Sequence, residues 1–228
     1  MALRRRHALW LLGSAAVLYG LLAYVVAPDA WQRYVRRHPA IDDVPNLTRG
    51  GDGLPGDPVN LTLYGDEAAL RAAMGAAGWT VADPLDLRDD LRIAADTVGR
   101  KPYAAAPVSH LYLFGRVEDI AFEMPIGGDP ARRHHVRFWR TDREGRARWV
   151  GAASLDASVG LARTTGQVTH HIAPDVDAER DHVLHSLREA RRLREQWYVK
   201  GFHALRQGRN AGGDPWRTDG RLGAGRLG

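Results

Sequence analysis

Two histidine doublets are the residues of this 228-residue chain best suited to chemistry. His134-His135 and His170-His171 each lie in a stretch whose alternating apolar and polar side chains predict a β-strand. Because successive side chains of a strand point to opposite faces, one histidine of each doublet should face the core and the other should face away. If the two strands are neighbours, one histidine from each doublet converges on a shared site.

Such a convergence would supply metal ligands or proton-transfer groups. Imidazole is the commonest metal ligand among side chains and changes charge near neutral pH, so it can serve either purpose. Acidic residues after the strands could complete a zinc site, and the candidates are Asp156, Asp175 and Asp177. The chain has no His-x-Glu-x-x-His or similar spacing, so we expect no cofactor from ligand spacing, and structural hydrogen bonding is the competing interpretation.

A second group of candidates consists of arginines on the central predicted strands. Guanidinium groups bind phosphate and carboxylate in a bidentate manner, so several arginines on one concave face would form an anion site. The alternative is cross-strand ion pairing with neighbouring acids, which requires no ligand. The candidate anion-binding residues are Arg116, Arg133 and Arg137.

Composition limits the classes of function. The chain has no cysteine, which excludes disulfides, thiolate metal sites and cysteine nucleophiles. Its net charge of +5 comes almost entirely from arginine, which favours anionic lipid headgroups or an acidic partner. Basic residues alternate with acids and no aromatic-basic motif is present, so we expect no nucleic-acid partner. No nucleophile elbow, phosphate-binding glycine loop or dinucleotide fingerprint occurs, which argues against a standard enzyme.

The N-terminal segment predicts one membrane-spanning helix. Ala8 to Ala27 are twenty consecutive uncharged residues, and at about 1.5 Å each they match the roughly 30 Å of a hydrocarbon core. A cleaved signal peptide is the alternative, but Pro28 directly follows the small residues where cleavage would occur. We therefore expect a single-pass cell-membrane protein. Three arginines flank the segment on each side, so the arginine count does not set its orientation. The positive charge of an uncleaved N-terminal amine favours the N-terminus inside, and we therefore place the soluble domain outside the cytoplasm.

The remaining pattern predicts an α+β domain. A strand at Val59–Tyr64, helices at 66–77 and 86–98, five strands between 109 and 172 and a helix at 177–198 follow in order. This order predicts a two-layer sandwich with a largely antiparallel sheet of about five or six strands and about three helices, preceded by one transmembrane helix. The predicted divisions are an anchor at 1–28, a juxtamembrane segment and linker at 29–58, the domain at 59–200, and a Gly- and Arg-rich strap or tail at 201–228.

Four segments in order resemble the LssY C-terminal domain family. They are Pro107–Arg116, Asp119–Pro125, Arg133–Trp139 and Thr165–Asp181, and the resemblance extends from about Gly56 to Arg221. It implies a bacterial protein in a membrane context, since members often follow transmembrane segments and some follow a lipid-phosphatase domain of the PAP2 type. It implies no assigned catalytic residues. The phosphatase motifs are missing from this chain, so we do not expect phosphatase activity.

Together these features predict a binding or accessory module at the bacterial membrane surface. Its partners would be the lipid bilayer, through anionic headgroups, or a membrane protein, and the arginines would make the contact. The alternative is a metal-assisted hydrolase that uses the histidine doublets.

Overall fold

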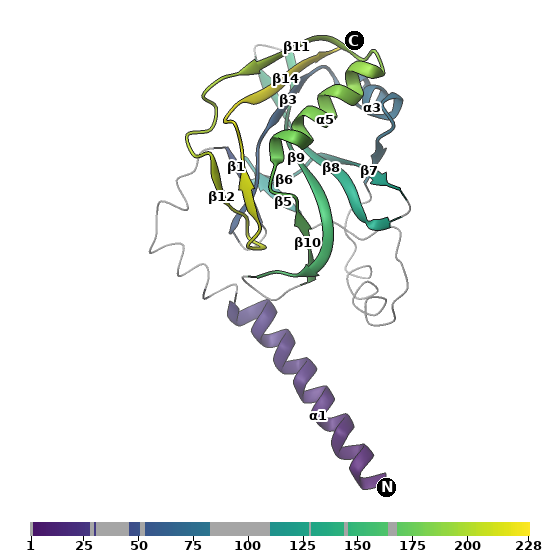
Figure 1. Ribbon diagram of the computed structural model, residues 1–228, viewed down its shortest axis with the longest axis vertical. Helices are drawn as coiled ribbons and strands as arrows, with labels where there is room; N and C mark the ends of the chain where they lie inside the picture. The colour runs from purple at the N-terminus through teal and green to yellow at the C-terminus, as the bar shows by residue number, and fades with distance from the viewer. Residues whose placement is uncertain are drawn as a thin grey trace.

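The computed structural model describes residues 2–27, 30, 46–50, 53–82, 110–127, 129–143, 146–163 and 168–228 (Figure 1). An eight-stranded sheet forms its centre, in the order β11-β14-β3-β9-β8-β7-β4, with β10 also paired to β9. Neighbouring strands are antiparallel, except that β14 and β3 are parallel. The strands are β3 (Leu61–Tyr64), β4 (Thr80–Val81), β7 (Ile120–Ile126), β8 (Asp129–Arg143), β9 (Arg146–Leu161), β10 (Val168–Ile172), β11 (Leu193–Val199) and β14 (Leu222–Leu227).

Two helices cover one face of this sheet and enclose the main core. The side chains of Asp66 and Asp175 accept hydrogen bonds from backbone N–H groups in the first turns of α3 (Glu67–Ala76) and α5 (Val176–Glu189). The apolar stripes of both helices then pack on side chains of β3, β8 and β9. The buried core residues include Leu61, Leu63, Leu70, Met74, Phe122, Val136, Phe138, Trp149, Val183, Leu184 and Leu187.

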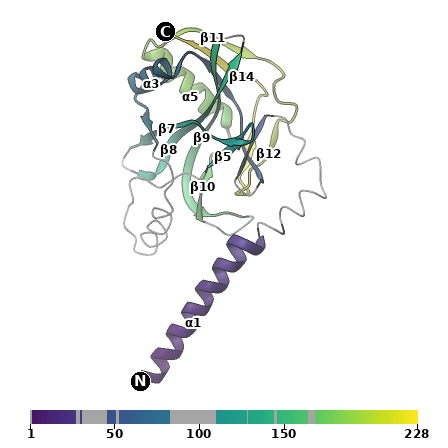
Figure 2. The same ribbon diagram turned by 180° about the vertical axis from the view of Figure 1, so that it is seen from behind.

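A second sheet lies on the opposite face. It has four strands in the order β2-β1-β5-β6, and Leu111 of β5 packs on Trp139 and Ala152 of the large sheet. Figures 1 and 2 show α5 on one side of the central strands and β5 on the other. The bounds are β1 (Leu47–Gly50), β2 (Pro55–Pro58), β5 (Leu111–Leu113) and β6 (Arg116–Val117), and a separate pair is formed by β12 (Gln207–Arg209) and β13 (Pro215–Arg217).

The predicted two-layer α+β sandwich is wrong, because the described chain is mainly β and builds several sheets. Three segments account for the difference. The Gly- and Pro-rich stretch before residue 59 contains β1 and β2, and the segment after residue 201 contributes β12, β13 and β14. The predicted helix at 177–198 ends early, since Arg191 adopts a positive φ of 56° and β11 follows. The predicted helix at 86–98 lies outside the described residues.

The predicted transmembrane helix is also corrected. In the described part of the chain, no helix is both long enough and apolar enough to cross a membrane. The apolar run from Ala8 to Ala27 is divided between two elements. Its first part belongs to α1 (Ala2–Leu21), which also contains three arginines, and the backbone then changes to the π-helix η1 (Leu22–Val26).

Candidate functional site

Strand β8 separates two chemical environments. Its even-numbered side chains Val136 and Phe138 belong to the helix-covered core, whereas Trp139 packs on the four-stranded sheet. Alternation therefore places Arg133, His135 and Arg137 together on the face that is turned away from the helices.

Arg133 organises one end of this face. Its Nε donates to Oδ2 of Asp156 on β9 at 3.1 Å, and its Nη1 donates to Oε2 of Glu123 on β7 at 2.9 Å. Its Nη2 lies 3.4 Å from Nε2 of His170 on β10. A guanidinium group can only donate, so Nε2 of His170 accepts and the ring proton resides on Nδ1. One buried arginine thus joins side chains from three other strands.

Asp57 organises the other end. This aspartate of β2 lies 3.6 Å from Nη1 of Arg137, and it accepts hydrogen bonds from Ser154 at 3.2 Å and Asn210 at 3.1 Å. Burial raises the pKa of Asp57 and outweighs the opposing effect of the Arg137 charge. The pKa of Asp156 is likewise raised by burial, against the charge of Arg133.

His135 lies between the two ends, directly opposite Ser154 of β9. Its side chain is completely buried, and neither ring nitrogen has a hydrogen-bond partner within the described structure. Burial, followed by the charges of Arg137 and Arg133, holds its pKa well below the usual range. The same causes lower the pKa of His170 to about 3. Both imidazoles are therefore neutral at physiological pH.

We call this group the sheet-face cluster. It comprises Asp57, Glu123, Arg133, His135, Arg137, Ser154, Asp156 and His170. It offers cationic donors, neutral imidazoles and carboxylates in one buried layer, and such a layer can hold a polar ligand without surrounding water. At the Arg133 end it reaches solvent, because the Glu123 side chain is 18% exposed and His170 is only partly buried.

The other histidine of each doublet has separate partners. His134 lies on the helix-covered side, where its Nδ1 is 2.8 Å from Oε2 of Glu179 and its ring stacks on His182 at 3.8 Å between centroids. The Nδ1 of His171 is 2.7 Å from Oδ1 of Asp214. Only His135 and His170, one histidine from each doublet, therefore share the sheet-face cluster. Among the described residues, no group of three or more histidines and acids is arranged to hold a metal ion.

The remaining candidates from the sequence lie elsewhere. Arg116 on β6 contacts the Asp119 carboxylate and the backbone carbonyl of Arg140. Asp175 caps α5 and pairs with Arg217 at 3.0 Å. Of the three candidate anion-binding arginines, the structure brings together only Arg133 and Arg137.

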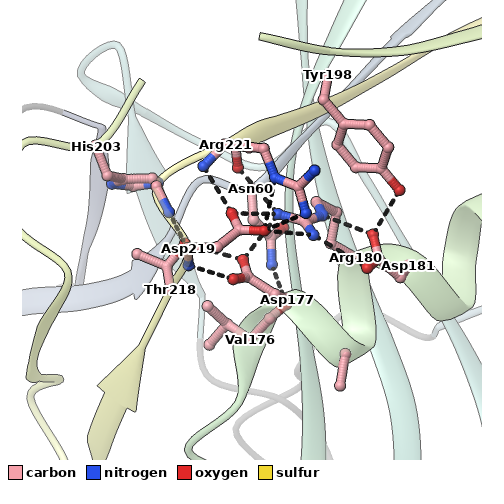
Figure 3. A network of polar contacts seen from close by, with 12 residues as sticks. Asn60, Val176, Asp177, Arg180, Asp181, Tyr198, His203, Thr218, Asp219 and Arg221 are labelled. Carbon is pink, nitrogen blue, oxygen red and sulfur yellow. Dashed lines mark hydrogen bonds and ion pairs between the residues drawn. The ribbon is translucent and has the colours of Figure 1, made fainter. Parts of the chain in front are cut away.

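Asp177 belongs to a second network, which is centred on Arg180 of α5 (Figure 3). The buried guanidinium of Arg180 contacts Asp177 at 2.9 Å, Asp181 at 2.8 Å and Asp219 at 3.1 Å. Tyr198 donates to Asp181 at 2.9 Å, and the Arg180 guanidinium lies over its ring. These partners come from α5, from β11 and from the segment between β13 and β14, so the network anchors the end of the chain to the helix.

Sequence reasoning missed Arg180, Glu179 and Asp57. Glu179 and Arg180 carried a signal, because they fall on the same helical stripe as Val176, Val183 and Leu187. A charged residue on such a stripe indicates a buried polar contact. Asp57 carried no comparable signal, since its short strand lies in a Gly- and Pro-rich stretch.

Residues 41–222 match the family model described as LssY C-terminus. No curated protein matches the chain. No solved structure matches it either.

Proposed function

We propose that this chain, which belongs to the LssY C-terminus family, is a binding module for an oxyanion. The oxyanion would occupy the sheet-face cluster and accept hydrogen bonds from its imidazoles. The observation that carries the proposal is the complete burial of His135 with no partner at either ring nitrogen in the described structure. A buried polar group without a hydrogen-bond partner costs about 1–3 kcal/mol, and a bound ligand that makes this hydrogen bond would remove the cost.

The electrostatics of the cluster favour an anion. The charges that shift the pKa values of His135 and His170 are those of Arg133 and Arg137, together with the neighbouring histidines. All of these lower the pKa, so both imidazoles experience a positive potential despite the nearby carboxylates. Burial raises the pKa values of both nearby buried acids, Asp57 and Asp156. A negatively charged acceptor is therefore attracted to the imidazole N–H groups.

The oxyanion is either free in solution or part of a lipid headgroup. The net charge of +5 is consistent with a module that works at an anionic membrane surface, where headgroup phosphate is abundant. A metal-assisted hydrolase would use one histidine of each doublet as a metal ligand. His135 and His170 share the cluster, but Nε2 of His170 accepts from Arg133, and among the described residues no group of three or more histidines and acids is arranged to hold a metal ion. We therefore do not adopt this second function.

Isothermal titration of the full chain with inorganic phosphate tests the proposal. We expect binding in the ~millimolar range or tighter that weakens with added salt. His135→Leu should abolish phosphate binding, and His185→Leu, at an exposed position of α5, is the matched control.

A parallel experiment uses vesicles of phosphatidylcholine with and without phosphatidate. Binding to phosphatidate vesicles that requires His135 identifies a headgroup ligand. The proposal is overturned if neither phosphate nor phosphatidate binds, or if His135→Leu binds as the native chain does.

A further inference from the structure

We infer that the sheet-face cluster selects an oxyanion that carries its own proton, namely phosphate or a phosphomonoester, over a fully deprotonated oxyanion such as sulfate. This inference rests on the proposed function and specifies its ligand. It follows from the mixture of donors and acceptors around Arg133 and His135.

The carboxylates of the cluster lie around Arg133. Glu123, Asp156 and His170 each contact a different nitrogen of the same guanidinium, at 2.9, 3.1 and 3.4 Å. Groups bonded to one guanidinium are close neighbours, because its nitrogens share a rigid planar fork. An anion that approaches the Arg133 guanidinium therefore meets carboxylate oxygens as well. Sulfate offers only acceptors and would face oxygen–oxygen repulsion there, whereas a P–OH group can donate to a carboxylate.

His135 is completely buried and neutral. A neutral imidazole has one N–H donor and one acceptor nitrogen, and in His135 both lack partners among the described residues. An acceptor-only anion can satisfy the N–H side alone. A phosphate, with both P–O and P–OH groups, supplies either kind of partner to whichever nitrogen it reaches. The site thus favours a ligand that donates as well as accepts.

Phosphate and sulfate differ in the protons that they bring to the cluster. A phosphomonoester loses its last proton near a pKa of about 6, so a protonated form is available near neutral pH. Sulfate has no proton to bring. To bind sulfate without repulsion, the cluster must take one proton from the buffer onto a carboxylate. The buried acids Asp57 and Asp156, whose pKa values are already raised, are the groups to accept it.

Calorimetric titration of the full chain at pH 7 with phosphate and with sulfate tests this selection, in two buffers of different ionisation enthalpy. We expect phosphate to bind at least about tenfold more tightly. We also expect sulfate binding to take up about one proton per chain and to strengthen as the pH falls. Glu123→Gln replaces a group that only accepts hydrogen bonds with one that also donates. The ratio of phosphate affinity to sulfate affinity should therefore decrease in this variant. Glu195→Gln, at an exposed position of β11, is the control.

The outcomes separate this inference from the proposed function. If phosphate and sulfate bind with equal affinity, or if Glu123→Gln leaves their ratio unchanged while the melting temperature shows a folded protein, the selection is refuted and the oxyanion module stands. If sulfate binds more tightly than phosphate, the inference is likewise refuted. If neither anion nor a phosphatidate vesicle binds, the proposed function itself fails.

Discussion

Arg133 and Asp156 are cross-strand neighbours on β8 and β9, and the arginine Nε donates to the aspartate Oδ2 at 3.1 Å. Both side chains are almost completely buried. A buried ion pair is stable when further hydrogen bonds satisfy its remaining groups, and Arg133 obtains them from Glu123 and His170. The pair therefore fixes the geometry of the sheet-face cluster as well as joining two strands.

Replacement of Arg133 by methionine should strongly destabilise the protein. The substitution leaves two carboxylates without their cation in a buried layer, which is expected to lower the free energy of unfolding by about 3–5 kcal/mol. Urea denaturation measures the loss. Arg226→Met serves as the control, because Arg226 is 45% exposed and pairs with Glu195 at 3.5 Å, and it should change stability by less than about 0.5 kcal/mol. A loss below about 1 kcal/mol in Arg133→Met would contradict this interpretation of the pair.

His135→Leu should have the opposite effect on stability. Leucine removes a buried imidazole that has no partner in the described structure, so the free energy of unfolding should rise by about 1–2 kcal/mol. The variant should at the same time lose phosphate binding. Thermal denaturation and calorimetry on the same sample test both expectations, with His185→Leu for comparison. A destabilised variant would mean that His135 has a structural partner in solution.

Arg180→Met should release the C-terminal strands from α5. Arg180 contacts Asp219 at 3.1 Å and the carbonyl of Arg221 at 3.2 Å, and its aliphatic stem fits against Gly223, where a Cβ would come within 2.9 Å. We expect a loss of about 3–5 kcal/mol, because three aspartates lose their shared cation. Hydrogen exchange should accelerate first in residues 219–227. Arg188→Met, at an exposed position of the same helix, should leave that exchange unchanged.

The sequence predicts individual strands of this protein better than their assembly. Period-two alternation in β8 is a local property, so the opposite placement of His134 and His135 follows from it directly. The pairing of β14 with β3, by contrast, joins residues more than 150 positions apart and leaves no local pattern. The same holds for Asp57, which reaches Arg137 and Asn210 only through the packing of a second sheet. Partners of this kind depend on tertiary structure alone.

The two doublets illustrate the same limit at the candidate site. Alternation indicates which histidines share a face, but it does not indicate that β9 lies between β8 and β10. His170 therefore meets Arg133 across an intervening strand, and His171 meets Asp214 of the C-terminal segment. Alternation left a metal site as one alternative, whereas the described geometry supplies arginine and aspartate partners.

Acidification should reduce the stability of the folded protein through His170. Its pKa is lowered to about 3 in the folded protein, by burial and by the charges of Arg133 and Arg137. The unfolded chain takes up a proton at this residue near pH 6.5, but the folded protein does not. The unfolded state thus binds more protons between pH 6.5 and 3, and the free energy of unfolding should fall through this window as the pH decreases.

The comparison of His170→Leu with the native chain isolates the contribution of His170 to the pH dependence of stability. Asp57, Asp156 and Glu179 have raised pKa values, so they stabilise the folded state on acidification and partly mask the histidine in the native profile. These acids remain in the variant, and only the His170 proton is lost. Urea denaturation at pH 7.5, 6 and 5 should therefore show a smaller acid-induced loss of stability in His170→Leu. If the free energy of unfolding changes with pH in the same way in both proteins, His170 protonates in the folded state as it does in the unfolded chain. It would then not face the positive potential on which oxyanion binding depends.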